Sequence, residues 1–324
     1  MKAAVIGFGS IAKRHVENLR ASHPEVEVLA LRQQAKPVAG VDIVTSDWSE
    51  LLAFAPDIAF VTSPSSCHIS QAVTLVENGI DTLIEKPLAN SLAEVASLQA
   101  AHASSSAILM LAYQFRFYSP FLHIREILSS KALGRIQSIR IETGMYLPDW
   151  RPHLDYRDSV SAQRALGGGV LLELSHELDY LAWLFGSPKR VCALVRRQSD
   201  LELDVEDSAE ALLEMSSGAF ASLHIDMVQR VPHRTIRVCG SEGSLEWNWA
   251  THTVRHWTVE SQAWQEKVFS DTARNTMYEN QLEHFLACVK SRETPAVGVG
   301  DGVAALQLVS ALARSSEREE WISL

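Results

Sequence analysis

AAVIGFGSIA, residues 3–12, decides how the first part of this chain folds. A run of apolar residues leads into two glycines, and the segment that follows, 10–22, has the apolar spacing of a helix. Such a run is typical of a strand buried on both faces of a parallel sheet. Gly7, Gly9 and Ala12 fit the pattern G-x-G-x-x-G/A, in which a tight turn brings the backbone close to a pyrophosphate at a helix N-terminus. The stretch therefore predicts a strand, a turn and a helix that bind a dinucleotide.

The same alternation continues to about residue 117. Further buried strands are expected at 26–31, 57–62, 81–85 and 107–113, with helices within 65–79 and 91–103. Strands and helices that alternate at this spacing form a doubly wound α/β sheet. We therefore expect a Rossmann domain over residues 1–118.

Residues 119–324 are expected to form a second domain of a different kind. From 190 to 260 short segments with strand-like patterns follow one another without long helices, which favours an open, largely antiparallel sheet. Two helices are expected near 276–290 and 301–315. Trp247, Trp249 and Trp257 either form a subunit interface on this sheet, which would make the protein a homo-oligomer, or pack under the domain's own helices.

Composition excludes several classes of protein. A formal charge of −10 without a basic run argues against nucleic-acid binding. Four widely spaced cysteines fit neither a disulfide scaffold nor a zinc site, and no apolar run is long enough to span a bilayer. His252 and His256 lack a third ligand nearby. We expect a cytoplasmic protein without a metal or a membrane partner.

The end of the second strand bears on the choice of cofactor. NAD-binding folds place an acidic residue there for the ribose 2′-hydroxyl, whereas this chain has Arg32 and no carboxylate before Asp42. An arginine can pair with a 2′-phosphate, which favours NADP(H) over NAD(H). The alternative is that Arg32 stacks on the adenine and both cofactors bind.

Several motifs together resemble one known family. They are GFGSIA, TSPSSCHISQAVTLVENGIDTLIEKPLA (62–89), AYQFRFYSPF (112–121), LGRIQSIRIETGMYLPDWRP (133–152) and GGGVLLELSHELDYLAWLFG (167–186). This combination is similar to the Gfo/Idh/MocA (glucose–fructose oxidoreductase, inositol dehydrogenase, rhizopine catabolism) family, over most of residues 1–190. Those proteins are two-domain NAD(P)-dependent oxidoreductases that act mostly on sugars, polyols and nucleotide sugars. The resemblance implies a Rossmann domain followed by an α+β domain built on an open sheet.

The resemblance also implies roles for individual residues. Lys86 matches the family's active-site lysine, and His176 matches its catalytic histidine, which also contacts the substrate. Tyr113 and Arg116 match positions that line the cleft for the substrate. The residues expected to bind the cofactor are Gly7, Phe8, Gly9, Ser10, Ile11, Arg32, Ser63, Pro64, His68, Glu85, Lys86 and Gln114.

The surroundings of His176 depart from the family pattern. That pattern has an aspartate four residues before the histidine, where this chain has Leu172, and the nearest upstream acid is Glu173. If the stretch is one helix, Glu173 and Asp179 each lie about 60° from His176 around its axis, and Glu177 lies about 100° away. We expect Glu173 to orient the imidazole, with Asp179 as the alternative.

The long segment 145–169 is rich in aromatic and charged residues, and long structured loops are often functional. Trp150, Arg151, Tyr156 and Arg157 are the residues expected to contact the substrate, and the arginines favour a carboxylated or phosphorylated sugar. The alternative is a charged surface loop with internal salt bridges.

The function expected is hydride transfer between a nicotinamide and a secondary hydroxyl or ketone of a sugar, sugar acid or nucleotide sugar. His176 would move the hydroxyl proton, and Lys86 would stabilise negative charge on the oxygen. Three alternatives stay open: a redox-neutral glycosidase of the same fold, a non-catalytic NADP-binding regulator, and a methyltransferase.

Overall fold

The computed structural model describes residues 1–270 and 273–324, which divide into two compact units. The first unit comprises Met1–Gln114 and Met277–Val303, and the second comprises Phe115–Thr276 and Ala304–Leu324. The sequence placed the division after residue 118 and assigned all later residues to the second domain. Residues 277–303 belong with the first unit because they are tied to its sheet: Arg292 forms an ion pair with Asp81 at 2.6 Å, and the Leu111 amide donates to the Val297 carbonyl.

The first unit is built on a six-stranded parallel sheet with the order β3-β2-β1-β4-β5-β6. The predicted doubly wound α/β fold is confirmed. The sequence reading did not find β3 and α2, since both are too short to show a clear period. The strands are β1 (Lys2–Ile6), β2 (Glu27–Leu31), β3 (Ile43–Thr45), β4 (Ile58–Val61), β5 (Asp81–Glu85) and β6 (Leu109–Ala112). The helices are α1 (Ser10–Ser22), α2 (Trp48–Phe54), α3 (His68–Glu77), α4 (Val95–Ala103), α8 (Thr276–Ser291) and the first turn of α9 (Val299–Arg318).

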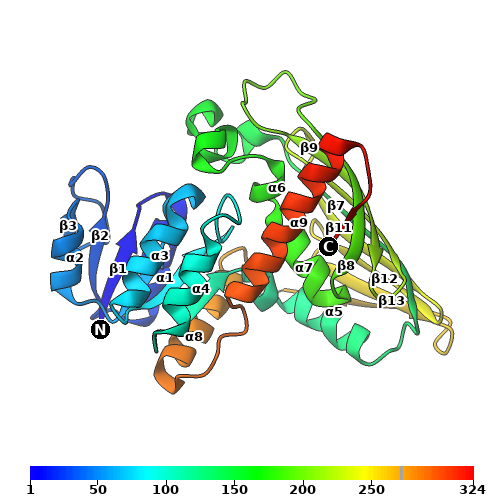
Figure 1. The fold of residues 1–324 in the computed structure, drawn as a ribbon. Coiled ribbons are helices and arrows are strands. Elements are labelled where there is room, and N and C mark those ends of the chain that lie inside the picture. Colours follow the sequence, from blue (N-terminus) through cyan, green and yellow to red (C-terminus); the bar gives the residue numbers. More distant parts are fainter. Residues whose placement is uncertain (271–272) are drawn as a thin grey trace. The chain divides into compact units, whose positions relative to one another are not determined.

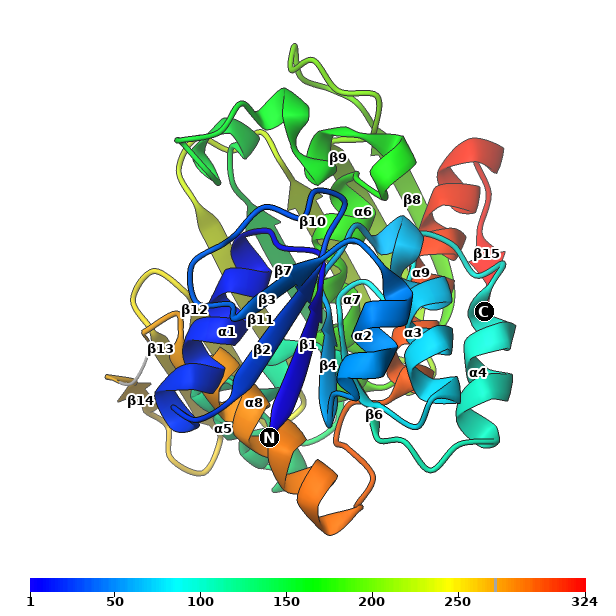
Figure 2. The same ribbon diagram turned by 90° about the vertical axis from the view of Figure 1, so that its left-hand side faces the viewer.

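Helices cover both faces of this sheet, with α1 and α8 on one side of the strands and α2, α3 and α4 on the other (Figure 2). One contact joins α8 to α1, and another joins it to the sheet. The Arg14 guanidinium of α1 lies 4.5 Å from the centre of the Tyr278 ring, and Phe285 packs edge-on against Phe60 of β4 at 6.2 Å. Because α1 begins directly after β1, its start borders the carboxyl end of that strand, where α/β folds bind ligands.

The second unit is built on a nine-stranded sheet with the order β14-β13-β12-β11-β7-β10-β9-β8-β15. Its pairs are antiparallel except for β7 with β10, which agrees with the predicted open, largely antiparallel sheet. Helices α5, α6, α7 and α9 lie over one face of it (Figure 1). The strands are β7 (Ile136–Gly144), β8 (Pro188–Arg196), β9 (Ser208–Met215), β10 (Phe220–Asp226), β11 (His233–Gly240), β12 (Gly243–Asn248), β13 (Thr253–Thr258), β14 (Trp264–Val268) and β15 (Ile322–Ser323). The other helices are α5 (Ser119–Ser129), α6 (Val170–Glu173) and α7 (Ser175–Phe185).

The tryptophans of the sheet take different positions. Trp247 is buried, and its ring packs edge-on against Phe121 of α5 at 4.8 Å. Trp249 lies 5.4 Å from the Tyr118 ring on the same side, whereas Trp257 is half-buried. Internal packing, one of the two expected arrangements, therefore applies to Trp247 and Trp249.

Residues 1–270 and 273–324 contain neither a membrane-spanning helix nor a cluster of metal ligands. No helix among them has the length and apolar character needed to cross a membrane. No group of three or more histidine, cysteine, aspartate and glutamate side chains among them is arranged to hold a metal ion.

Candidate active site

The glycine loop between β1 and α1 has the geometry of a phosphate-binding turn. Gly7 has a φ of +82°, and a Cβ there would lie 2.9 Å from the backbone N and Cα of Ser63, so a side chain has no room. A Cβ at Gly9 would meet no atom within 4 Å, and no side chain caps the helix that Gly9 begins. Ala12 is fully buried where α1 packs on the sheet. The open space at Gly9 and the uncapped N–H groups of α1 fit a diphosphate.

The rest of the predicted cofactor loop is accessible. Ser10 is exposed, and Phe8 and Ile11 are half-buried. Arg32 follows β2 directly, and its guanidinium forms no ion pair or hydrogen bond with any other described residue. The guanidinium is therefore available to a ligand at the end of the second strand, where the sequence placed the adenosine ribose.

Glu85 ends β5 and holds the backbone next to Lys86. One carboxylate oxygen accepts from His15 Nε2 at 2.7 Å, and the other accepts from the Lys86 amide at 3.3 Å. The His15 ring, fully buried, stacks on Phe60 at 5.1 Å with an angle of 20° between the planes. The sequence reading expected Glu85 to contact the cofactor and did not identify His15, because a partner 70 residues away leaves no local signal.

His68 joins two loops of the first unit. Its Nε2 lies 2.8 Å from the Ser63 carbonyl and its Nδ1 lies 2.9 Å from the Pro87 carbonyl. Burial lowers the pKa of His68, and the two carbonyl contacts oppose that shift. Because main-chain carbonyls occupy both ring nitrogens, the predicted direct contact with the cofactor is not supported. His68 instead fixes the loop that carries Ser63 and Pro64 to the loop that follows Lys86.

Tyr113 and Gln114 follow directly after strand β6. The Gln114 side-chain amide donates to the Tyr278 hydroxyl at 3.1 Å, which connects β6 to α8. Tyr113 is fully buried, so its predicted contact with a substrate has no support in this arrangement.

In the second unit, the segment around His176 is two short helices and not one. Gly169 has a φ of +108°, and a Cβ there would collide with the Glu206 carboxylate, which explains the glycine. Helix α6 ends at Glu173, Leu174 has a φ of −99° and a ψ of 28°, and α7 begins at Ser175. The expected angle of about 60° between Glu173 and His176 assumed one continuous helix. It does not apply, because the two residues lie on different helices.

Asp179 forms a buried ion pair with Arg116. Arg116 donates to both carboxylate oxygens, from Nε at 3.0 Å and from Nη2 at 2.6 Å, and both side chains are buried. The guanidinium also lies 5.6 Å from the Trp183 ring. The charge of Asp179 is thereby compensated, and Arg116 supports α7 where the sequence had assigned it to the substrate. Glu173 remains our candidate for orienting His176.

The imidazole of His176 packs against Phe115, whose ring lies 5.2 Å away at an angle of 72°. The Arg234 guanidinium lies over the same phenyl ring at 4.8 Å. The Arg234 Nε is 2.9 Å from a carboxylate oxygen of Glu177, which is completely buried. Burial and the charge of Glu177 raise the pKa of Tyr180, the neighbour of Glu177 on α7, well above its ordinary value. The sequence reading did not identify Arg234, because it enters from β11, 57 positions beyond Glu177 in the chain.

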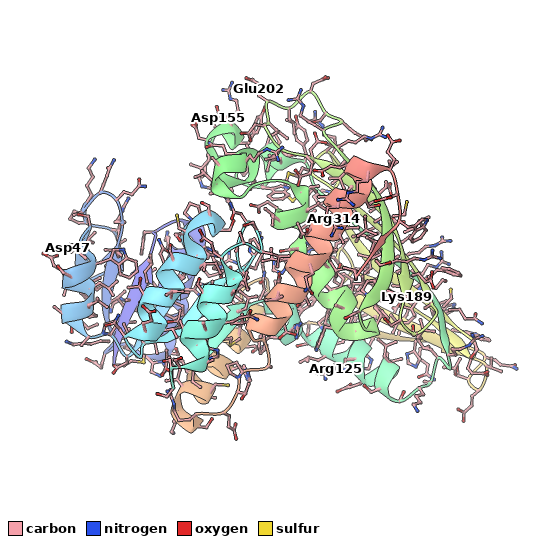
Figure 3. All side chains as sticks on the ribbon, viewed as in Figure 1. Asp47, Arg125, Asp155, Lys189, Glu202 and Arg314 are labelled. Atoms are coloured by element: carbon pink, nitrogen blue, oxygen red, sulfur yellow. The ribbon has the colours of Figure 1, made fainter. Side chains whose placement is uncertain are left out.

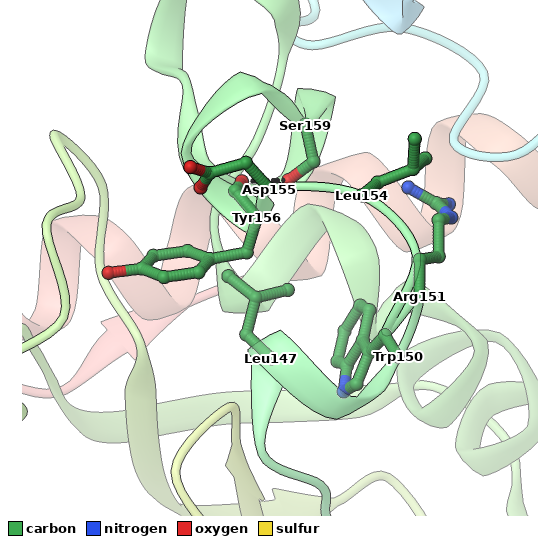
Figure 4. Close-up of a pocket in the computed structure, with 7 residues that line it drawn as sticks. All are labelled: Leu147, Trp150, Arg151, Leu154, Asp155, Tyr156 and Ser159. Atoms are coloured by element: carbon green, nitrogen blue, oxygen red, sulfur yellow. Dashed lines mark hydrogen bonds between the residues drawn. The ribbon is translucent and has the colours of Figure 1, made fainter.

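The long segment after β7 forms a pocket of its own (Figure 4). The Trp150 indole donates to the Met145 carbonyl at 2.9 Å, and the Tyr156 hydroxyl accepts from the Glu202 amide at 3.1 Å. In Figure 4 the side chains of Arg151 and Leu154 lie on one side of this pocket and Tyr156 on the other. The lining residues are Leu147, Trp150, Arg151, Leu154, Asp155, Tyr156 and Ser159.

Arg157 is not available as the predicted anion-binding residue. Its guanidinium binds Asp155 at 2.6 Å and Glu202 at 3.2 Å, and these acids lie on neighbouring loops (Figure 3). Hydrogen bonds from Arg157 lower the pKa of Asp155 to about 2, so the pair is charged at neutral pH. Arg164 likewise donates to the Asp204 carbonyl. These contacts are those of the alternative reading, a loop with internal salt bridges.

Two family models match the chain over most of its length. One describes the oxidoreductase family with an NAD-binding Rossmann fold and matches residues 1–113. The other describes the GFO/IDH/MocA C-terminal domain and matches residues 121–246. The first unit is therefore an NAD-binding Rossmann fold, as its glycine loop indicates.

Individual relatives agree with these models. The chain is 26% identical to D-xylose 1-dehydrogenase (NADP(+)) 2 of Haloferax volcanii and covers 100% of both sequences. It is 28% identical to myo-inositol 2-dehydrogenase of Thermotoga maritima, over 100% of this chain and 98% of that protein. The solved structure of levoglucosan dehydrogenase in complex with NADH superposes with a TM-score of 0.88 at 19% identity, over 100% of this chain and 98% of that one, which shows the shared fold. The chain belongs to the GFO/IDH/MocA family of oxidoreductases.

Proposed function

We propose that this oxidoreductase transfers a hydride between a nicotinamide cofactor and a secondary hydroxyl or ketone of a sugar, sugar acid or nucleotide sugar. The glycine loop carries the proposal, because Gly9 leaves open space above an uncapped helix N-terminus that suits a diphosphate. The substrate class is supported by full-length relatives that are named for D-xylose and myo-inositol.

The chain's own residues move the proton and stabilise the charge. When bound, the nicotinamide supplies the hydride acceptor or donor. His176 takes the hydroxyl proton during oxidation and returns it during reduction, a step that is typically worth about 10²- to 10⁴-fold in rate. The Lys86 ammonium orients the hydroxyl and stabilises negative charge that develops on its oxygen. Glu173 orients the imidazole and favours its protonated form.

For the cofactor we propose a preference for NADP(H), with NAD(H) also bound. Arg32 follows the end of β2, and its guanidinium forms no ion pair or hydrogen bond with another described residue. A guanidinium can pair with a phosphate dianion through two N–H groups. If Arg32 recognises the 2′-phosphate, Arg32→Ala raises the dissociation constant of NADPH and leaves that of NADH unchanged. Equal dissociation constants for both cofactors in the unaltered protein would contradict this preference.

For the substrate we propose contacts with Trp150, Arg151 and Tyr156 of the pocket in Figure 4. We further propose a cytoplasmic homo-oligomer that forms through the sheet face that the helices of the second unit leave open. Leu194, Leu212 and Phe220 are exposed on the strands β8, β9 and β10. Sedimentation of the purified protein tests the oligomer, and a monomer at micromolar concentration would refute it.

The function is tested by following absorbance at about 340 nm, where the reduced nicotinamide absorbs. NAD⁺ and NADP⁺ are combined with neutral sugars, polyols, sugar acids and nucleotide sugars, and the reduced cofactors with the corresponding ketones. We expect a net absorbance change with at least one substrate class. A redox-neutral enzyme would consume a glycoside without any net change, and a non-catalytic regulator would bind cofactor without consuming any substrate.

A further inference from the structure

We infer that Arg234 binds a carboxylate group of the substrate, so that the proposed sugar substrate is a sugar acid. The inference rests on the proposed function, since it names the substrate class of the same site. Three observations support it: the ion pair of Arg234 with Glu177, the Phe115 ring that contacts both Arg234 and His176, and the ion pairs that occupy Arg116 and Arg157.

The guanidinium of Arg234 is fixed by a buried acid. Glu177 is completely inaccessible to solvent, and an ionised carboxylate in that position is strongly destabilising unless a cation compensates it. The Arg234 Nε, 2.9 Å away, supplies that charge, and the face of the Phe115 ring supports the guanidinium at 4.8 Å. A flexible surface arginine would lose side-chain entropy on binding a ligand, whereas Arg234 is already held.

The other end of the guanidinium is free to bind. About 20% of the side chain is exposed, and within residues 1–270 and 273–324 no hydrogen bond is formed by Nη1 or Nη2. These two nitrogens present parallel N–H groups in a plane, the geometry that matches the two oxygens of a carboxylate. The contact of Nε with Glu177 is an ion pair without a hydrogen bond, and Nε is buried, so Nη1 and Nη2 are the nitrogens that remain for a ligand.

The position of Arg234 suits a substrate contact. Phe115 packs against both the Arg234 guanidinium and the His176 imidazole, so the two groups lie on one aromatic ring. Arg234 also pairs in register with Thr143 of β7, and the chain leaves that strand to form the pocket with Trp150 and Arg151. Arg234 therefore lies beside the candidate base, on the strand next to the one from which the pocket segment leaves.

Two of the arginines that the sequence assigned to the substrate are already paired. Arg116 binds Asp179 through two hydrogen bonds, and Arg157 binds Asp155 and Glu202. Their charges are cancelled by acids of their own. Arg151 lines the pocket after β7, whereas Arg234 is the arginine that shares the Phe115 ring with His176, so Arg234 is the one placed to bind an anionic group beside the candidate base.

Arg234→Lys is the variant that tests this inference. It keeps a cation for Glu177 and removes the planar fork, so the second unit should still fold. Arg237→Lys is the matched control: Arg237 lies on the same strand, is 61% exposed, and pairs with Glu246 at 3.1 Å. Kinetics of the cofactor-loaded protein are compared for D-glucuronate against D-glucose and for D-gluconate against D-glucitol, and calorimetry measures the binding of each acid.

We expect the unaltered protein to prefer the acid of each pair. Arg234→Lys should raise KM and the dissociation constant for the acid by about 10- to 100-fold, since a charge-assisted contact is lost, while the neutral partner is unaffected. Arg237→Lys should change neither. Equal use of acid and neutral sugar by the unaltered protein, or an equal loss for both in Arg234→Lys, would overturn the inference.

Two further results keep the inference separate from the proposed function and from folding. If the acids bind through Arg234 but no nicotinamide is reduced or oxidised, the inference stands and the proposed function falls. If neutral sugars are oxidised and the acids neither bind nor react, the function stands and the inference falls. Should Arg234→Lys not fold, the double variant Glu177→Gln/Arg234→Gln removes both buried charges together, and it too should abolish the preference for acids.

Discussion

Replacing Gly9 with alanine should separate cofactor binding from folding. Gly9 has a φ of −94°, which any residue adopts, and a Cβ there would meet no protein atom within 4 Å. Glycine-to-alanine changes at such compatible positions stabilise proteins by about 0.4–1 kcal/mol, because the unfolded chain loses freedom. The new methyl group would stand in the space above the α1 N-terminus, where the diphosphate must approach the backbone.

The expected loss is one of affinity alone. An extra methyl group in a filled site costs about 1–3 kcal/mol, which corresponds to a rise of about 5- to 150-fold in the dissociation constant. Titration of NADH and NADPH fluorescence measures the affinity, and urea denaturation measures the stability of the same samples. Gly9→Ala should unfold at the same or a slightly higher urea concentration than the unaltered protein.

Two other glycines provide the controls. Gly7→Ala should destabilise the first unit by more than about 1–2 kcal/mol, because its φ of +82° is unfavourable for a side chain and its Cβ would lie 2.9 Å from the Ser63 backbone. Gly79→Ala carries similar backbone strain at a φ of +71° without a neighbour within 4 Å, so it should lower stability modestly and leave cofactor affinity unchanged. Wild-type affinity in Gly9→Ala would refute the assignment of this loop to the diphosphate.

Three further predictions concern buried and half-buried charges. Arg116→Met leaves the Asp179 carboxylate buried without the Arg116 guanidinium and should lower the free energy of unfolding, measured by urea titration, by about 3–5 kcal/mol. The double variant Arg116→Met/Asp179→Leu should recover most of this loss. No loss in the single variant would contradict the pairing. The pKa of His224 is raised to about 9, mainly by its hydrogen bond with Asp226, so its contribution to stability is complete below its unfolded pKa of about 6.5 and is lost as the pH rises through 9. The urea concentration at the midpoint of unfolding should fall over this pH range, and His224→Gln should make that fall smaller. The same pH dependence in both proteins would refute the prediction. His15→Phe should lower turnover, whereas His15→Gln, whose side-chain amide can still donate to Glu85, should keep both the turnover and the cofactor affinity of the unaltered protein. Equal turnover in the two variants would show that the hydrogen bond to Glu85 does not hold Lys86 in place.

Local patterns predicted the first unit well because its strands are continuous apolar runs. The strand, glycine turn and helix of residues 2–22 carry their own signals in period, turn chemistry and burial, and the structure confirms the expected Rossmann fold. The family resemblance, which the family models confirm, rested on this glycine loop together with motifs farther along the chain, among them 62–89 and 167–186.

The features that sequence reasoning missed depend on partners distant in the chain. Gly169 is required by the carboxylate of Glu206, and Leu174 interrupts a helix that apolar spacing alone would have continued. The sequence placed Glu177 only by its angle from His176, because no residue near it in the chain indicates its partner, Arg234 of β11. Spacing along the chain identifies which residues share an element, whereas the charge that compensates a buried acid is set by the fold.

The central claim is tested most directly by the turnover of His176→Ala. With the substrate found in the absorbance screen, the account predicts that turnover falls by about 10²- to 10⁴-fold, since proton transfer loses its base, while the dissociation constant of the cofactor stays the same. His176→Ala that turns over at the rate of the unaltered protein would contradict the account.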